Sequence, residues 1–348
     1  MDYTINRAPV GRRNCLGKIF VIAGILTSSV CLAQQEKLNW KQETTQAQWQ
    51  ARDSQGEFVY KDHLWVMGGW FTAKDPNPRD VWKSPDGKNW TRVTEVAPWE
   101  YSDLPGSLVF KKQMWMLGGR KVPGTACSNE VWSTKDGADW RLVIASAPWR
   151  KRLGASSVVF KNRMWIMGGT ENFYQNNDST LMNDVWSSAD GVNWRLETDN
   201  APWSKRAHGQ AVVFDGKIWM MGGGHRAPKA IPTNDVWCSS DGVNWEQVTG
   251  SAPWRPRLWF STLVYRDRMW VIGGWSSEKE GNCSDVWYSK DGKNWTELKS
   301  DVIWSKRHEH AAFVFRDKIW VAGGATGDNH LLDSQVWSLN IPKNWFND

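Results

Sequence analysis

Three side chains able to transfer protons lie just before two apolar segments of the chain. His208 precedes one segment, and Glu309 and His310 precede another. Carboxyl and imidazole groups are the side chains that most often serve as general acids and bases. We therefore predict Glu309, His310 and His208 as candidate catalytic residues.

His308 and His310 are two residues apart, so in an extended chain their side chains point the same way. This spacing suits a pair of metal ligands, but the sequence indicates no third ligand. The cysteines after residue 33 are Cys127, Cys238 and Cys283, an odd number without the spacing of a zinc site or a disulfide framework. We predict no metal and no cofactor, and we place His308 among the ligand-binding residues.

An arginine stands three residues after a tryptophan in five places along the chain. A guanidinium group can bind a carboxylate or phosphate through two parallel hydrogen bonds. Alternatively, these arginines bind neighbouring backbone and fix packing, and the sequence leaves both roles open. The five arginines predicted to bind an anionic ligand are Arg52, Arg152, Arg206, Arg257 and Arg307, and Ser102 occupies the sixth equivalent position.

Tryptophan is unusually frequent, with 28 residues in a chain of 348. All but three recur at four fixed positions of a repeat, where a large apolar side chain is expected to pack between structural units. Trp70, Trp259 and Trp275 lie outside these positions. We predict that these three bind a ligand, because an aromatic face can pack on the carbons of a sugar ring.

The repeat is marked by Gly-Gly pairs that begin at Gly68, Gly118, Gly168, Gly222, Gly273 and Gly323. Six copies of about 50 residues fill positions 38–348. Short β-branched and aromatic runs joined by Asp-Gly turns predict antiparallel hairpins. In the third copy the four expected strands span 157–160, 164–167, 184–187 and 193–196.

Four strands repeated about every 50 residues match the period of kelch repeats. The double glycine after the second strand, the tryptophan on the fourth and the arginine before the first also resemble kelch repeats. The chain resembles exported bacterial six-bladed kelch proteins, a type that includes N-acetylneuraminate epimerase. The resemblance implies an all-β, six-bladed kelch-type β-propeller with four-stranded antiparallel blades. Galactose oxidase has a related fold and uses copper held by Tyr, Cys and His, but its ligand set has no evident match here.

The ends of the chain offer two ways to complete the sixth copy. Trp40 precedes Trp49 by nine residues, the same gap as between Trp90 and Trp99. We therefore expect residues 38–43 to supply the outer strand of the sixth copy and close the ring. Residues 343–345, which contain Trp345, are the rival segment.

The connections between strands differ in length on the two faces of such a ring. In a four-stranded antiparallel blade, the links from second to third strand and from fourth to next first strand emerge on one face. Nearly all length variation falls in these links, including residues 170–183 and 224–234. Because function concentrates on variable loops held by a rigid scaffold, we predict that this loop-rich face binds the ligand.

Residues 1–33 are typical of a signal peptide, with basic residues, an apolar run at 19–26 and small residues before a cleavage site after Ala33. We expect residues 34–348 to form the propeller in the periplasm or outside the cell. The net charge is +6, half of it within residues 1–33, and no Lys/Arg run suggests nucleic-acid binding. The mean hydropathy of -0.58 excludes a protein with many membrane spans.

The sequence is consistent with three functions. The favoured one is a carbohydrate-binding propeller, expected to be monomeric, that recognises an acidic sugar or glycan. The second is a mutarotase or epimerase acting on a sialic-acid-type sugar, with Glu309, His310 or His208 moving the proton. The third is a protein-interaction scaffold that contacts a partner through its loops.

Overall fold

A computed structural model describes residues 37–174, 177, 179–278, 281–327 and 329–346. These residues belong to one compact unit, Lys37–Asp348. Its secondary structure consists of antiparallel strands, in six four-stranded sheets and two smaller ones. Within the described ranges, no helix has the length and apolar character needed to cross a membrane. The protein is all-β, and its sheets are compatible with the blades of a β-propeller.

The four-stranded sheets follow the six sequence repeats. The first contains β2 (Gly56–Tyr60), β3 (His63–Met67), β4 (Val81–Ser84) and β5 (Thr91–Thr94). The second contains β6 (Gly106–Phe110), β7 (Gln113–Leu117), β8 (Val131–Thr134) and β9 (Arg141–Ile144). The third contains β10 (Ser156–Phe160), β11 (Arg163–Met167), β12 (Val185–Ser188) and β13 (Trp194–Thr198). All four strands expected in the third repeat are confirmed to within two residues.

The remaining repeats form three further sheets. The fourth contains β14 (Gln210–Phe214), β15 (Lys217–His225), β16 (Ile231–Ser239) and β17 (Glu246–Thr249). The fifth contains β18 (Ser261–Val264), β19 (Met269–Ile272), β22 (Val286–Ser289) and β23 (Thr296–Glu297). The sixth contains β25 (Ala311–Phe315), β26 (Lys318–Ala322), β29 (Val336–Leu339) and β1 (Lys41–Thr44).

Two small sheets lie in the connections of the fifth and sixth repeats. One pairs β20 (Trp275–Ser276) with β21 (Gly281–Asn282). The other joins β24 (Arg307–His308), β27 (Ala325–Thr326) and β28 (Leu331–Leu332). These pairings draw the long connections back against the segment that precedes each first strand.

In five of the six repeats, the Asp-Gly turn between the third and fourth strands packs against a neighbouring sheet. In the first sheet, Asp86 accepts hydrogen bonds from the amides of Lys88 and Asn89, which closes the Asp-Gly turn. A Cβ on Gly87 would lie 2.3 Å from the ring of Trp320, in the sixth sheet, so this close approach requires glycine. The equivalent turn glycines each approach the second-strand tryptophan of another sheet: Gly137 on Trp65, Gly191 on Trp115, Gly242 on Trp165 and Gly292 on Trp219.

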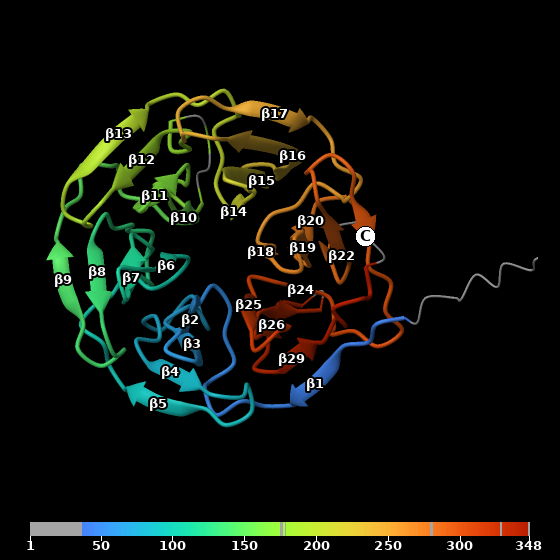
Figure 1. Ribbon diagram of the computed structural model, residues 1–348. Helices are drawn as coiled ribbons and strands as arrows, with labels where there is room; N and C mark the ends of the chain where they lie inside the picture. Colours follow the sequence, from blue (N-terminus) through green and yellow to red (C-terminus); the bar gives the residue numbers. More distant parts are fainter. Residues whose placement is uncertain (1–36, 175–176, 178, 279–280, 328, 347–348) are drawn as a thin grey trace, which may run out of the picture. The chain divides into compact units, whose positions relative to one another are not determined.

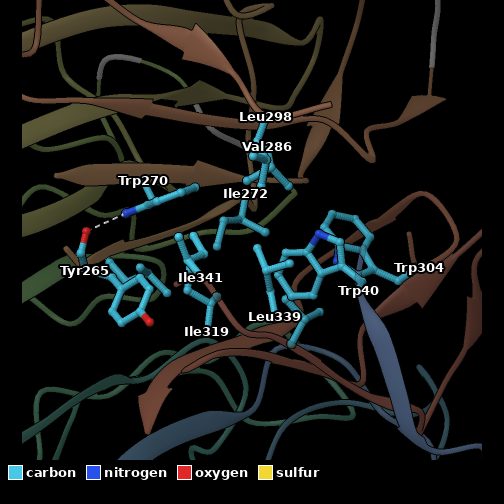
Figure 2. Close-up of a cluster of buried hydrophobic side chains, with 12 residues drawn as sticks. Trp40, Tyr265, Trp270, Ile272, Val286, Leu298, Trp304, Ile319, Leu339 and Ile341 are labelled. Atoms are coloured by element: carbon cyan, nitrogen blue, oxygen red, sulfur yellow. Dashed lines mark hydrogen bonds between the residues drawn. The ribbon is translucent and has the colours of Figure 1, made fainter. Parts of the chain in front are cut away.

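The tryptophans between sheets pair edge to face with the tryptophan of a fourth strand. Trp49 meets Trp90 with ring centroids 5.9 Å apart, and four later repeats show the same arrangement. The sixth pair is Trp304 with Trp40, at 5.8 Å. Figure 2 shows these two rings beside Leu339 in the core between the fifth and sixth sheets. Trp40 therefore occupies the fourth-strand position of the sixth repeat.

The first strands of the six sheets contact one another in a closed cycle: β2 with β6, then β10, β14, β18, β25 and β2 again. β1 pairs with β29, so Lys41 lies opposite Ser338 although the two are at opposite ends of the chain. Figure 1 shows β1, in blue, alongside β29, in red. Residues 343–345 form no strand. The predicted signal peptide, residues 1–33, lies outside the described residues.

Candidate functional site

One position in each repeat has a left-handed backbone. It lies two residues after the repeated arginine position, and its φ angle is between 51° and 58° in all six repeats. Backbone hydrogen bonds join successive members, for example from the Leu104 amide to the Ser54 carbonyl at 3.1 Å and from the Ser54 amide to the Glu309 carbonyl at 3.1 Å. We call this set the left-handed ring: Ser54, Leu104, Gly154, His208, Trp259 and Glu309.

The left-handed ring lines a cavity of about 230 Å³. A left-handed conformation costs a side chain with a Cβ about 1–2 kcal/mol. Five of the six members carry that cost, which is the kind of strain found at functional sites. Their side chains differ in every repeat, although the backbone around them is repeated. The ring is thus a fixed frame that presents six unlike groups to one cavity.

The cavity wall below the ring comes from the first strands and carries one carboxyl group. Glu57 of β2 lies there, near Ser107 and Ser157 of the next two sheets. Burial raises the pKa of Glu57 to about 8, and a backbone hydrogen bond at Ala312 offsets part of the increase. Glu57 is therefore protonated at neutral pH and can donate a hydrogen bond into the cavity.

Glu309 and His208 of the ring are the two candidate catalysts that face this cavity together. Burial, together with the negative charges of Asp53 and Asp103, raises the pKa of Glu309 well above its usual range. Burial lowers the pKa of His208 to about 3. These surroundings favour the protonated form of Glu309 and make His208 a neutral imidazole at neutral pH.

His310, the third predicted catalyst, also borders the cavity but packs on Trp304, with ring centroids 5.7 Å apart. Burial lowers its pKa well below the usual value, and the charge of Arg307 adds to the effect. Neither of its ring nitrogens has a hydrogen-bond partner among the described residues. Its surroundings make His310 a neutral side chain held by the core.

The residue before each ring member is polar in three repeats: Asp53, Asp103 and His308. Asp103 is buried and binds Arg120 at 2.5 Å. Burial raises the pKa of Asp103, while Arg120 acts in the opposite direction. The Asp53 carboxylate is also buried, and His330 Nε2 lies 3.0 Å from its Oδ2. Burial and the charge of Asp103 raise the pKa of Asp53 well above its usual range.

His308 lies beside the Asp53–His330 pair. Its Nδ1 is 2.5 Å from Asn282 Oδ1, and its ring centroid is 5.1 Å from that of His330. The side chains of Asp53, His308 and His330 bring their ligand atoms within 4.8 Å of one another. Among the described residues, these three are the ones placed to hold a metal ion. His310, the metal partner considered for His308 on spacing, is not in this group.

Aromatic rings surround Trp259 on the same side of the cavity. Trp259 lies 5.8 Å from Trp275, 5.1 Å from His208 and 5.3 Å from His308 between ring centroids. Phe173 stacks on Trp259 at 6.4 Å. Two of the three predicted ligand-binding tryptophans therefore share one aromatic cluster.

Trp70, the third of these tryptophans, is half-buried and packs edge to face on His330, with ring centroids 5.3 Å apart. Its backbone pairs with that of Asp53. Trp70 therefore packs against the group formed by Asp53, His308 and His330.

Two arginines outside the repeated positions contact the aromatic cluster. Arg226 is exposed, and its guanidinium lies 5.0 Å from the Phe173 ring and 5.8 Å from the Trp259 ring. The Arg120 guanidinium lies 4.3 Å from the centroid of the same Phe173 ring and is also bound to Asp103. No carboxylate pairs with Arg226 in the described part of the chain. Arg226 thus offers a positive charge at the rim of the cavity.

The five repeated arginines precede the first strands and are buried, each with at most 2 % of its surface exposed. Arg152 is typical: its guanidinium binds both oxygens of Asp184 at 2.8 Å and donates to the Gly168 carbonyl. The same Asp184 also accepts a hydrogen bond from Trp186. These contacts favour the packing role, and ligand binding stays a prediction for Arg52, Arg152, Arg206, Arg257 and Arg307.

Several residues of the site were not predicted. Asp53 and Asp103 directly follow the repeated arginine column, where the third, fourth and fifth repeats have apolar residues, so an alignment of the repeats contains a signal for them. Phe173, Arg226 and His330 come from connections that differ in every repeat, and no spacing rule indicates their position. The missed residues are Asp53, Glu57, Asp103, Arg120, Phe173, Arg226, Asn282 and His330.

Comparison with known proteins adds no identity to this geometry. No protein-family profile matches the chain, and no curated protein is significantly similar to it.

Proposed function

We propose that the chain is an exported six-bladed kelch-type β-propeller that binds a carbohydrate, favouring an acidic sugar or glycan, on its loop-rich face. The closed cycle of first strands and the pairing of β1 with β29 support the six-bladed ring closed from the N-terminus. The kelch assignment rests on the repeat pattern. Export rests on residues 1–33 alone.

The observation that carries the binding proposal is the aromatic and cationic rim of a polar cavity. Trp275, Trp259 and Phe173 form a connected aromatic surface. The adjoining cavity presents hydroxyl, amide and carboxyl groups, including those of Ser54, Gln55 and Glu57. Apolar faces combined with a few convergent polar groups are typical of small-ligand sites.

Preference for an acidic sugar is supported by Arg226 rather than by the repeated arginines. Its guanidinium is exposed at the rim and stacks on Phe173 and Trp259. A carboxylate on a sugar packed against these rings would accept hydrogen bonds from the guanidinium. The five repeated arginines already donate to partners within the fold, so they strengthen this preference less than Arg226 does.

A thermal-shift screen against N-acetylneuraminate, uronic acids, neutral sugars and sulfated oligosaccharides tests the proposal. A ligand at 100 times its dissociation constant stabilises the folded protein by about 2.7 kcal/mol. We expect acidic sugars to raise Tm and Arg226→Gln to reduce the shift. Arg141→Gln, on the outer strand β9, is the matched control and should keep it. A screen without any shift would reject sugar binding and favour a protein partner.

A second candidate function, mutarotation or epimerisation of the bound sugar, is favoured by the pair Glu309 and His208. A carboxyl group whose pKa is raised and a neutral imidazole line one cavity, and both are side chains of the kinds used in general acid–base catalysis. Faster anomeric exchange on adding the protein, lost in Glu309→Gln while sugar binding persists, would establish it. Unchanged exchange with a sugar that binds would leave a binding protein without this activity.

A further inference from the structure

Asp53, His308 and His330 come together from distant parts of the sequence. Asp53 follows the first repeated arginine, His308 belongs to β24, and His330 lies in the connection between β27 and β28. Their ligand atoms lie within 4.8 Å of one another. Packing of apolar side chains does not explain why these three residues come together, because Asp53 is polar and fully buried.

The hydrogen bonds around Asn282 determine which nitrogen of His308 faces the group. Asn282 Nδ2 donates to the carbonyls of Ala325 and Gly327, at 3.2 and 3.0 Å. Its Oδ1 must therefore accept a hydrogen bond from His308 Nδ1, at 2.5 Å. A neutral imidazole that donates through Nδ1 carries a lone pair on Nε2. Metal-binding histidines are oriented in this way, by an oxygen that accepts the other ring N–H.

The side chains of Asp53 and His308 both offer lone pairs to this point, and Ser54 and Glu309 are the side chains that can donate a hydrogen bond to Asp53. Glu309 Oε2 lies 4.0 Å from His308 Nε2, on the same side as Asp53. Both Asp53 oxygens are buried without a hydrogen bond of good geometry from the described residues, although His330 Nε2 is 3.0 Å from one of them. Buried acceptors facing one another are unfavourable unless a proton or a cation lies between them. The charge of Arg120, which reaches Asp53, is neutralised by Asp103.

We propose that Asp53, His308 and His330 bind one divalent first-row transition-metal ion of the Zn²⁺ class, next to the ring members Ser54 and Glu309. Two imidazoles and one carboxylate form a ligand set that such ions prefer. A three-residue set leaves at least one coordination position for water or a ligand oxygen. This inference goes beyond the proposed sugar binding and does not depend on it.

The geometry requires a small closure on binding. Bonds of about 2.0–2.2 Å to one ion place ligand atoms closer together than the widest separation seen here. His330 has 43 % of its side chain exposed, whereas Asp53 and His308 are held by surrounding structure. His330 is therefore the ligand that moves inward, and it is the most exposed of the three residues to substitute.

The test uses the full chain, prepared without a histidine tag and dialysed against a chelator. Titration with ZnCl₂ should show one ion bound per chain, and CoCl₂ should give the visible absorption of protein-bound Co²⁺. His330→Ala should lose both signals, and its Tm without metal measures separately the cost of losing the contact with Asp53. His63→Ala, at the start of β3 and outside the group, is the matched control and should bind as the wild type does.

A second variant examines the orienting contact. Asn282→Ala removes the acceptor for His308 Nδ1, and loss of such an outer partner lowers metal affinity by about 10–100-fold. Asn282→Asp keeps an acceptor oxygen and should retain more affinity than Asn282→Ala. Absence of zinc binding by the wild type, or equal binding by His330→Ala, would overturn the proposal and leave Asp53 and His330 as an ion pair only.

The sugar screen is repeated on the chelated protein, so the two proposals fail separately. Loss of zinc binding with an intact sugar shift would reject the metal site alone. Stoichiometric zinc binding with no sugar shift would support the metal site and reject the proposed ligand.

Discussion

At the scale of single residues, the fold determines the backbone of the left-handed ring, whereas the side chains of the ring are available to a ligand. Each repeat imposes the same backbone conformation at this position, and backbone hydrogen bonds join its members. The side chain is free to differ because it points into a cavity rather than into a neighbouring sheet. The frame thus accepts residues as different as Ser54, His208, Trp259 and Glu309, whereas the third repeat has Gly154.

Gly154→Ala should destabilise the protein and displace His208. A Cβ at this position would lie 2.6 Å from His208 Nδ1, and φ is +58°. The left-handed backbone alone costs about 1–2 kcal/mol, to which the displacement adds. Denaturant unfolding should show the loss. Gly250→Ala is the control, because the nearest atom is 3.6 Å from the added Cβ, and it should keep the wild-type stability. Equal stability of the two variants would contradict the prediction.

Glu57 should make stability depend on pH in the neutral range. Its pKa is raised to about 8 by burial, so above the unfolded-state pKa of 4.5 the unfolded chain loses its proton while the folded protein keeps it. The free energy of unfolding should therefore fall as pH rises from 5 to 8, by up to about 1.4 kcal/mol per pH unit from this group.

Glu57→Gln should flatten this part of the profile of Tm against pH. Asp53 and Glu309 also have raised pKa values and contribute to the slope of both proteins, so the difference between the two profiles isolates Glu57. Glu246→Gln, on the exposed side of β17, serves as control and should keep the wild-type slope. Parallel profiles for wild type and Glu57→Gln would show that Glu57 ionises normally.

At the scale of elements, four of the six sheets are held to their incoming connection by a repeated arginine and an aspartate: Arg52 with Asp80, Arg152 with Asp184, Arg206 with Asp235 and Arg257 with Asp285. The aspartate precedes the third strand and joins the arginine to the strand's own tryptophan, as Asp184 does for Arg152 and Trp186. The connection that carries the left-handed ring is anchored by this contact two residues upstream. The contact between arginine and aspartate therefore determines where the site residues of that connection lie.

Asp184→Asn should cost about 3 kcal/mol of stability, because it leaves the buried Arg152 charge without its counterion. Chemical unfolding of the variant provides the measurement. Asp62→Asn removes the partner of Arg316 from a pair in which both side chains are more than half exposed, and it should leave the unfolding midpoint unchanged. Similar losses in both variants would mean that burial does not distinguish the two pairs.

At the scale of the whole molecule, the sixth sheet takes its outer strand from the other end of the chain. Trp40 then fills the place that Trp90 fills in the first sheet, against Trp304. The first and sixth repeats meet at Asp53, His308 and His330, so the pairing of the chain ends also assembles the proposed metal site.

Trp40→Ala should destabilise the protein by about 3–5 kcal/mol, as expected for a buried tryptophan, and Trp90→Ala should cost a similar amount. Trp345→Ala should cost less, because Trp345 is only partly buried and lies outside every sheet. Removing residues 34–45 should be more damaging than Trp40→Ala. Calorimetric unfolding distinguishes these cases, and a larger effect of Trp345→Ala would favour closure by the C-terminal segment.

The repeated features of this protein are determined by the sequence itself. Strand positions, hairpin turns and the packing tryptophans could be predicted because each depends on residues a few positions apart, such as Asp86 and Gly87 in their turn. Four strands in each repeat are recovered for the same reason. The predicted positions of Trp259, His208, His308 and Glu309 before first strands also follow from the repeat.

Only the tertiary structure decided what those residues contact. Arg152 is buried because Asp184, the residue before β12, satisfies its charge, and no spacing distinguishes that outcome from an exposed guanidinium. His308 meets Asp53 and His330 because the first and sixth sheets are adjacent, although Asp53 and His330 are far apart in sequence. Local periodicity specifies the elements, whereas burial and charge pairing across sheets depend on atoms that the sequence does not place together.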